Sequence, residues 1–121
     1  MWTGVPAIVL TWLVISGFAA WSDITSNAPE DAEQIEITGQ QFTWLIRYGG
    51  MDNEVGAYDY RLIDATNQLG VDFTDKNNFD DFENNSIVLP KGRPVLLKIR
   101  AKDVLHSVYM PHMRLKMDAV P

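Results

Sequence analysis

The sequence predicts a membrane-anchored, mainly β protein: one transmembrane helix followed by an all-β domain of the sandwich or barrel kind. Three observations indicate this class. The first 21 residues carry no charge. Short segments farther along alternate apolar and polar residues, and glycines and prolines separate those segments. The 121 residues suffice for one globular domain, or for a small domain with an anchor.

Residues 1–21 are expected to span a membrane. A helix of this length extends roughly 30 Å, the thickness of the hydrocarbon core of a bilayer. Trp2 and Trp21 lie at its two ends, where interfacial aromatic residues are typical. A cleaved signal peptide is the alternative, but it would have a basic start and a shorter apolar core, whereas the first basic residue here is Arg47. The polar residues 22–33 predict a linker.

The remaining residues, 34–121, are expected to form the β domain. Alternation of apolar side chains predicts strands in QIEIT (34–38) and QFTWLIRY (41–48), followed by a turn at the glycines of YGGMDN. Residues 51–85 are polar and weakly patterned. We therefore expect a long loop there, with a short helical turn around residues 79–82.

The C-terminal third returns to alternating patterns. SIVLP and the turn KGRP precede a strand, VLLKIRA (95–101), and two further segments, VLHSVYM (104–110) and HMRLKM (112–117), also read as strands. Met117–Pro121 provides no closing strand, and the apolar run starts directly at Met1. We therefore expect these residues to be a segment of a longer polypeptide.

Charge is divided unevenly along the chain. Residues 1–90 contain 14 acidic and 3 basic residues, a net charge of −11, whereas residues 91–121 contain 7 basic and 2 acidic residues, a net charge of +5. The acidic part argues against nucleic acid as a partner and suits the attraction of a basic protein. A solvated acidic surface is the simpler interpretation of charge alone. The chain has no cysteine, which excludes a disulfide scaffold or a thiolate metal site within these residues.

Both histidines and three of the five methionines lie near the C-terminal end. Copper binds imidazole and thioether ligands, so a metal site is one interpretation. Alternation places His106 on an apolar face with Val108, and a lone histidine on such a face is more often a hydrogen-bonded core residue. His112 is expected to be exposed, and its spacing from His106 is not that of a turn-based chelate. The residues alone give only weak evidence for metal.

Three stretches of the chain, in order, resemble subunit II of the haem–copper cytochrome c oxidases: WTGVPAIVL, ITGQQFTWLIRYGGMD and NNSIVLPKGRPVLLKIRAKDVLHSVYMPHMRLKMDAVP. The resemblance covers essentially the whole chain and is most specific from Leu89 to Pro121. It implies a cupredoxin-like Greek-key β-barrel or sandwich, incomplete at its C-terminus, preceded by the transmembrane helix. It also implies a bacterial inner membrane, with the β domain on the extracytoplasmic (periplasmic) side.

The resemblance further implies an electron-transfer subunit of a respiratory, proton-pumping oxidase. In the family, a dinuclear copper centre called CuA accepts electrons from cytochrome c. It passes them to haem in subunit I, where haem and a further copper reduce oxygen to water. The implied partners are subunit I and other oxidase subunits, cytochrome c or a cytochrome c domain, and the lipid bilayer. The catalytic site itself belongs to another subunit.

Individual residues match the family's functional positions. His106, in DVLHS, matches the first CuA ligand, whereas the other ligands belong to a Cys-x3-Cys-x3-His-x2-Met loop that these residues do not contain. Phe42 stands where the family has the tryptophan that receives electrons, and Trp44 matches the second tryptophan of that motif. The resemblance also implies contacts with partner proteins for Asp103, Asp118, Arg114 and Lys116.

Three rival interpretations explain parts of the sequence. A quinol oxidase subunit II that has lost CuA would have a structural role and would account for the missing cysteines, but it has no reason to keep His106 in an intact DVLHS. A membrane-tethered β domain that binds a ligand would not explain the stretch from Leu89 to Pro121. Nitrous oxide reductase also carries a CuA barrel, but the membrane helix argues against it.

Overall fold

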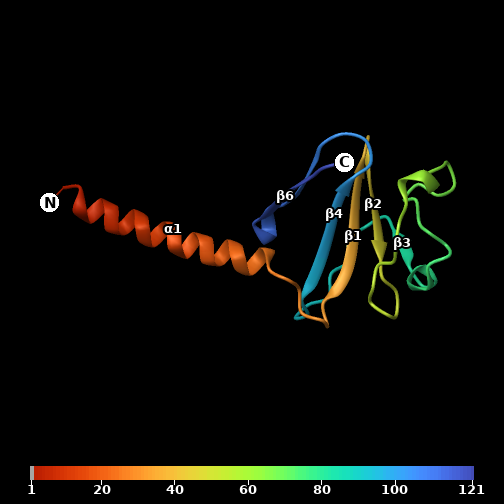
Figure 1. Ribbon diagram of the computed structural model, residues 1–121, viewed down its shortest axis with the longest axis horizontal. Helices are drawn as coiled ribbons and strands as arrows, with labels where there is room; N and C mark the ends of the chain where they lie inside the picture. Colours follow the sequence, from red (N-terminus) through yellow and green to blue (C-terminus); the bar gives the residue numbers. More distant parts are fainter. Residues whose placement is uncertain (1) are drawn as a thin grey trace.

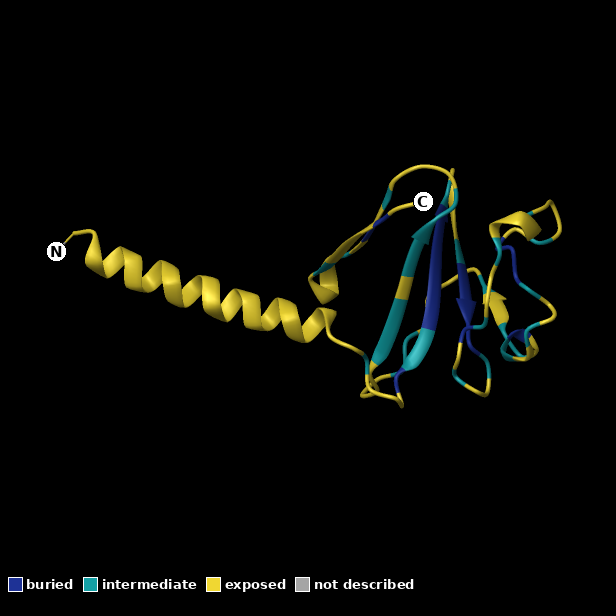
Figure 2. Cartoon of the chain, viewed as in Figure 1, coloured by how far each residue is buried: buried dark blue, intermediate teal, exposed yellow. Residues whose placement is uncertain are grey.

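In the computed structural model, which describes residues 2–121, a long helix leads into a domain of β strands (Figure 1). The helix, α1 (Gly4–Thr25), is exposed along its whole length (Figure 2). It is long and apolar enough to cross a membrane. It continues four residues beyond the uncharged stretch predicted to span the membrane, and Met1 of that stretch lies outside the described residues.

The two hydroxyl side chains in the apolar part of α1 form hydrogen bonds within the helix. Thr11 Oγ1 donates to the carbonyl oxygen of Ala7 at 2.8 Å, and Ser16 Oγ donates to that of Trp12 at 2.8 Å. A hydroxyl without a partner is costly in hydrocarbon, where no water replaces the missing bond. These two residues are therefore compatible with a lipid environment.

The β domain contains a four-stranded sheet with the strand order β3-β2-β1-β4, and a separate two-stranded hairpin, β5-β6. β1 is central: it pairs antiparallel with β2 and parallel with β4, so the sheet is mixed. The fold is thus one apolar helix followed by mixed β-sheets. The strands are β1 (Glu33–Gln40), β2 (Thr43–Tyr48), β3 (Phe82–Asn84), β4 (Val95–Ala101), β5 (His106–Met110) and β6 (Leu115–Ala119).

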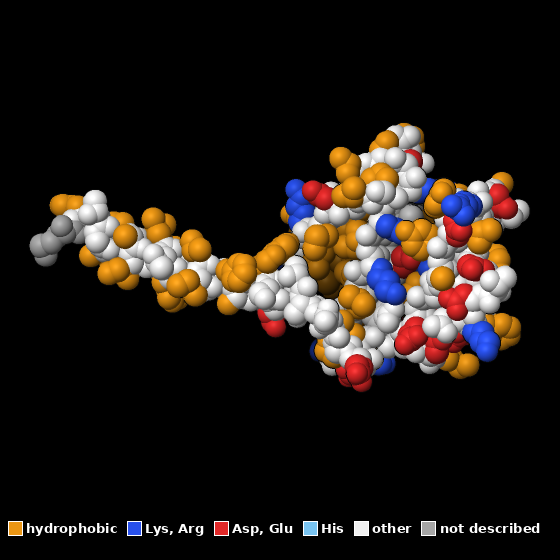
Figure 3. Space-filling view, viewed as in Figure 1, with side chains coloured by type: hydrophobic (Ala, Val, Ile, Leu, Met, Phe, Trp, Pro, Cys, Tyr) orange, Lys and Arg blue, Asp and Glu red, His pale blue; other side chains and the backbone are white. Residues whose placement is uncertain are grey.

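The apolar core lies between this sheet and the β5-β6 hairpin. Its buried side chains come from β1, β2 and β5, and Figure 2 shows that burial is concentrated in the two central strands, β1 and β2. The buried core residues are Ile35, Ile37, Ile46, Tyr48 and Val108. Partly buried side chains of β4 and β6 extend the core toward an apolar hollow of about 290 Å³, which opens beside the end of α1 (Figure 3). Alternation along β1 and β2 produces this face, as the sequence predicted.

The opposite face of the sheet carries a buried cluster of charges. Arg47 is 1% exposed and contacts Glu36 at 3.0 Å and Asp81 at 3.4 Å. Arg100 donates to the other oxygen of Glu36 at 2.6 Å, and Asn78 accepts from Arg47 at 3.0 Å. Burial raises the pKa of Asp81, an effect opposed by a backbone N–H donor and by the charge of Arg47. This cluster, called the Arg47 cluster below, fastens the β2–β3 connection to the sheet.

The β2–β3 connection differs from the expected loop. The helical turn expected around residues 79–82 occurs earlier, as a 3₁₀ turn at Lys76–Asn78, because the side chain of Asp75 accepts a hydrogen bond from a backbone N–H of that turn. Residues 82–84 instead form β3. Phe82 stacks on Tyr48 of β2, with ring centroids 5.1 Å apart, and this contact stabilises a strand too short for a sequence pattern to reveal.

Candidate metal centre

His106, the first residue of β5, lies against the end of β1. Its side chain is only 18% exposed. Gly39 of β1 makes this approach possible, because a Cβ added there would lie 2.8 Å from the ring carbons of His106. The indole of Trp44 closes a second side, edge to face, with ring centroids 5.6 Å apart. The imidazole therefore occupies a shaped space between two strands and is shielded from bulk solvent.

Asp103, in the β4–β5 loop, fixes the third side of the ring. Its Oδ1 lies 2.7 Å from His106 Nε2 and accepts from the backbone N–H of Val104 at 2.7 Å. Its Oδ2 accepts from the backbone N–H of Gln41 at 2.8 Å. The hydrogen bond from His106, followed by those of the two amides, lowers the pKa of Asp103 to about 2. The carboxylate is thus ionised at neutral pH.

This arrangement sets the chemistry of the two ring nitrogens. An ionised carboxylate only accepts hydrogen bonds, so Nε2 of His106 carries the proton that it donates to Asp103. In a neutral imidazole the lone pair is then on Nδ1, which has no hydrogen-bond partner among the described residues. Metal-binding histidines show this pattern, with a carboxylate on one nitrogen and the metal on the other. The residues present therefore fit one imidazole ligand.

One imidazole does not make a metal site. Within residues 2–121 the structure contains no group of three or more histidine, cysteine or acidic side chains placed to hold a metal ion. His112 lies in an exposed 3₁₀ turn, Pro111–Met113, and does not join His106. Any copper at His106 would need further ligands from outside the described residues.

Phe42 and Trp44 lie at and beside the tip of the β1–β2 hairpin. Phe42 was expected to share a strand face with Trp44, but β2 begins at Thr43, and Phe42 projects from the turn with its side chain fully exposed. Trp44 is partly exposed and touches the His106 ring. Trp44 thus connects the imidazole to the protein surface, whereas Phe42 is exposed at the hairpin tip.

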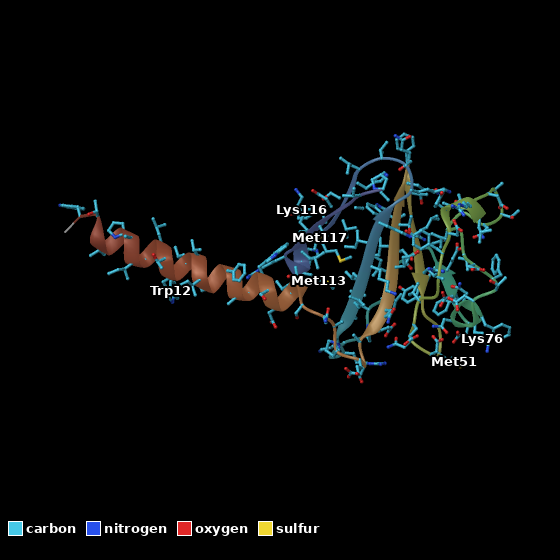
Figure 4. All side chains as sticks on the ribbon, viewed as in Figure 1. Trp12, Met51, Lys76, Met113, Lys116 and Met117 are labelled. Carbon is cyan, nitrogen blue, oxygen red and sulfur yellow. The ribbon has the colours of Figure 1, made fainter. Side chains whose placement is uncertain are left out.

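The four charged residues expected to contact partners fall in two places. Asp103 lies beside the imidazole, whereas Arg114, Lys116 and Asp118 are exposed on or next to β6. The expected strand 112–117 starts only at Leu115, because Pro111–Met113 forms a turn that Arg114 ends in the left-handed conformation, with φ of 54°. Figure 4 shows Lys116, Met113 and Met117 next to the end of α1.

Two contributors to the site were not predicted from the sequence. Gly39 provides the space for the ring, and the backbone N–H of Gln41 binds Asp103. A glycine inside an alternating strand pattern is a recognised sign of a close approach, so Gly39 could have been found. The backbone contact of Gln41 leaves no sequence signal, because any residue except proline has this N–H.

Comparison with known proteins identifies the family. The family described as "Cytochrome C oxidase subunit II, periplasmic domain" matches residues 34–121, which is most of the chain. The chain belongs to the cytochrome c oxidase subunit II family. Its apolar helix and the periplasmic domain of this family together indicate a membrane-anchored protein with an extracytoplasmic domain.

Several curated proteins of the subunit II family are similar to this chain. The alternative cytochrome c oxidase subunit 2 of Bradyrhizobium diazoefficiens is 39% identical over 90% of this chain and 40% of its own length. The probable cytochrome c oxidase subunit 2 of Rickettsia prowazekii is 32% identical over 100% of this chain and 36% of its own length. The cytochrome c oxidase subunit 2 of Metridium senile is 29% identical over 100% of this chain and 46% of its own length. The chain thus spans about two fifths of the length of these relatives.

Proposed function

We propose that this chain is part of the electron-transfer subunit of a respiratory haem–copper oxidase. It would receive electrons from cytochrome c at a CuA centre and pass them toward haem in subunit I. The observation that carries the proposal is the His106 site: a shielded imidazole whose Nε2 is bound to Asp103 and whose Nδ1 is available. Membership of the subunit II family supports it.

The proposal divides the chain by role. Residues 1–21 anchor the protein in the inner membrane of a bacterium, and residues 22–33 link this anchor to the β domain. Residues 34–121 form the N-terminal portion of a cupredoxin-like Greek-key barrel on the extracytoplasmic side. The mixed sheet facing a β hairpin across an apolar core supports this architecture. The hollow at the edge of that core is suited to further strands.

The residues of the chain would position the centre rather than break bonds. Copper bound at Nδ1 would exchange one electron at a time. Gly39, Trp44 and Asp103 hold the ring of His106 from three sides, so the ligand is prepared before metal binds. A ligand held by packing changes its geometry little when the charge of the metal changes, which favours fast electron transfer.

Docking would involve two regions of the domain, the β1–β2 hairpin and β6. Phe42 is fully exposed beside Trp44, so a donor could approach the ring at the β1–β2 hairpin. The acidic residues of the first 90 would attract a basic cytochrome c, an attraction that salt weakens. Arg114, Lys116 and Asp118, exposed on or next to β6, would contact subunit I and neighbouring subunits of the complex.

The test is the substitution His106→Ala in the full-length protein, with His112→Ala as the matched control. We expect His106→Ala to remove or strongly weaken the absorption of the mixed-valence copper centre and to lower the copper content, because one ligand is lost. His112→Ala should retain both, because that residue is exposed in a separate turn. A wild-type protein without copper would refute the proposal and favour a structural subunit of a quinol oxidase.

A further inference from the structure

The contacts of Asp103 connect two parts of the molecule that are far apart in sequence. Its Oδ1 is bound to the imidazole of His106 at 2.7 Å, three residues along the chain. Its Oδ2 is bound to the backbone N–H of Gln41 at 2.8 Å, 62 residues away at the tip of the β1–β2 hairpin. We propose that Asp103 is a positioning residue that couples this hairpin tip to the ring of His106.

The geometry supports coupling. Both carboxylate oxygens accept hydrogen bonds from donors within the chain, including the N–H of Val104 at 2.7 Å. Three such bonds hold the carboxylate in one orientation. Hydrogen bonds to a charged acceptor are about twice as strong as neutral ones, so this carboxylate restrains the groups that it touches.

The coupled groups are those on which electron arrival would depend. Gln41 directly precedes the exposed Phe42, and Trp44 touches the ring from the same hairpin. Loss of the carboxylate would release the backbone at the tip. It would also release the ring, which Gly39 and Trp44 confine only from the other sides. The inference rests on the proposed function for its copper readout, but the hairpin restraint exists without metal.

Two substitutions at Asp103 separate positioning from charge. Asp103→Glu keeps the negative charge, but the additional methylene moves the carboxylate away from one of its partners. Asp103→Asn removes the charge and presents one acceptor and one donor group. If its amide nitrogen donates to Nε2 of His106, the ring proton moves to Nδ1, the nitrogen that would bind metal. Positioning therefore predicts damage from both substitutions, whereas a docking charge predicts that the Glu variant behaves as wild type.

The experiment uses the full-length subunit in its purified complex and has two readouts. The first is hydrogen exchange of the Gln41 amide, measured from overlapping peptides of the β1–β2 hairpin. We expect it to be about tenfold faster or more in both variants, because Asp103→Glu displaces the acceptor of the Gln41 N–H and Asp103→Asn replaces a charged acceptor by a neutral one. The second is the absorption of the copper centre, which should shift or weaken in both. Asp31→Asn, exposed ahead of β1 and remote from the hairpin tip, is the charge-matched control and should change neither.

Each outcome decides a different point. Unchanged exchange at Gln41 in both variants would overturn the proposal, whatever the copper spectrum. Faster exchange with an unaltered spectrum would overturn the coupling to His106. A Glu variant identical to wild type in both readouts would assign Asp103 to docking. If the wild-type complex holds no copper, the proposed function fails, but the exchange of Gln41 still tests the restraint on the hairpin.

Discussion

Two clusters of acidic and basic groups lie on opposite sides of β1, and they differ in what they leave open. Glu36 points to one face, into the Arg47 cluster, where each charged group contacts an opposite charge. Gly39 points to the other face, where Asp103 binds only one nitrogen of His106. The first cluster is closed with respect to charge, although Arg47 Nε, Arg100 Nε and Asp81 Oδ1 have no hydrogen-bond partner among the described residues, and it holds a long connection on the sheet. The second leaves a lone pair facing outward, which is the requirement for binding a ligand.

The alternation of β1 produces this division. Successive side chains of a strand point to opposite faces, so one strand supplies both a buried charge and the space for the imidazole. The comparison indicates that stability and metal binding can be disturbed separately. Substitutions in the closed cluster should act on folding, and substitutions in the open cluster should act on the proposed copper site.

The largest effect is expected in the closed cluster. Arg47→Met would leave Glu36 and Asp81 buried without their common partner, and we expect a loss of about 3–5 kcal/mol in the free energy of unfolding. Denaturant unfolding of the full-length protein, followed by tryptophan fluorescence, measures it. Arg61→Met is the control, since Arg61 is exposed, and should stay within about 0.5 kcal/mol. Equal stability of both variants would contradict a structural role for the cluster.

A smaller effect is expected at the space for the ring. Gly39→Ala would place a methyl group 2.8 Å from the His106 ring, so the ring or the strand must move. Overpacking of this kind costs typically 1–3 kcal/mol, and the displaced ligand should alter the copper spectrum. Gly17→Ala is the control, because nothing lies within 4 Å of a Cβ at that position. An unaltered spectrum in Gly39→Ala would mean that the ring is not confined by β1.

At the hairpin tip we expect an effect on reaction rate without an effect on folding. Phe42 is fully exposed, so Phe42→Ala should change the free energy of unfolding by no more than about 0.5 kcal/mol. If a donor contacts the ring of Phe42, kcat/KM for cytochrome c should fall about tenfold. Phe79→Ala, equally exposed on the β2–β3 connection, should leave kcat/KM unchanged. Similar values for the two variants would remove Phe42 from the docking surface.

The smallest effect concerns the surface of the β2–β3 connection. Hydrogen bonds from the Thr66 hydroxyl and from the amides of Asn67 and Thr66 lower the pKa of Asp64 below its ordinary value of 3.8. A carboxyl whose pKa is lowered in the folded state stabilises that state above its ordinary pKa, and the contribution is lost as pH falls. Hydrogen-exchange protection of these amides should therefore decrease below about pH 4. Asp64→Asn should abolish this pH dependence, and a persisting dependence would contradict the assignment.

The sequence predicted the fold where a periodic pattern existed. Alternation located β1, β2, β4 and β5, and the uncharged run located the helix, because these patterns reflect a buried face or a lipid environment. It missed β3, which is three residues long and is stabilised by the stacking of Phe82 on Tyr48. It also did not predict burial of Arg47, since a charge inside an apolar strand reveals no partners until the chain is folded.

The candidate site was only partly predictable. Residue patterns alone favoured a core histidine at position 106, and the metal interpretation depended on resemblance to a family. In the structure the ring is mostly buried and hydrogen-bonded, as a core histidine would be, and the metal interpretation stays a prediction. The contact of Gln41 with Asp103 could not be predicted, because it joins a backbone group to a carboxylate 62 residues away.

The contact between Gly39 and His106 has a consequence for how this family can change through evolution. The two positions cannot vary independently: while the imidazole is retained, every side chain larger than hydrogen is disfavoured at position 39. A lineage that abandons the metal is released from this restriction and can acquire an alanine or a valine there. An alignment of homologues should then show substitution of the glycine at position 39 only in those sequences that have also lost the histidine.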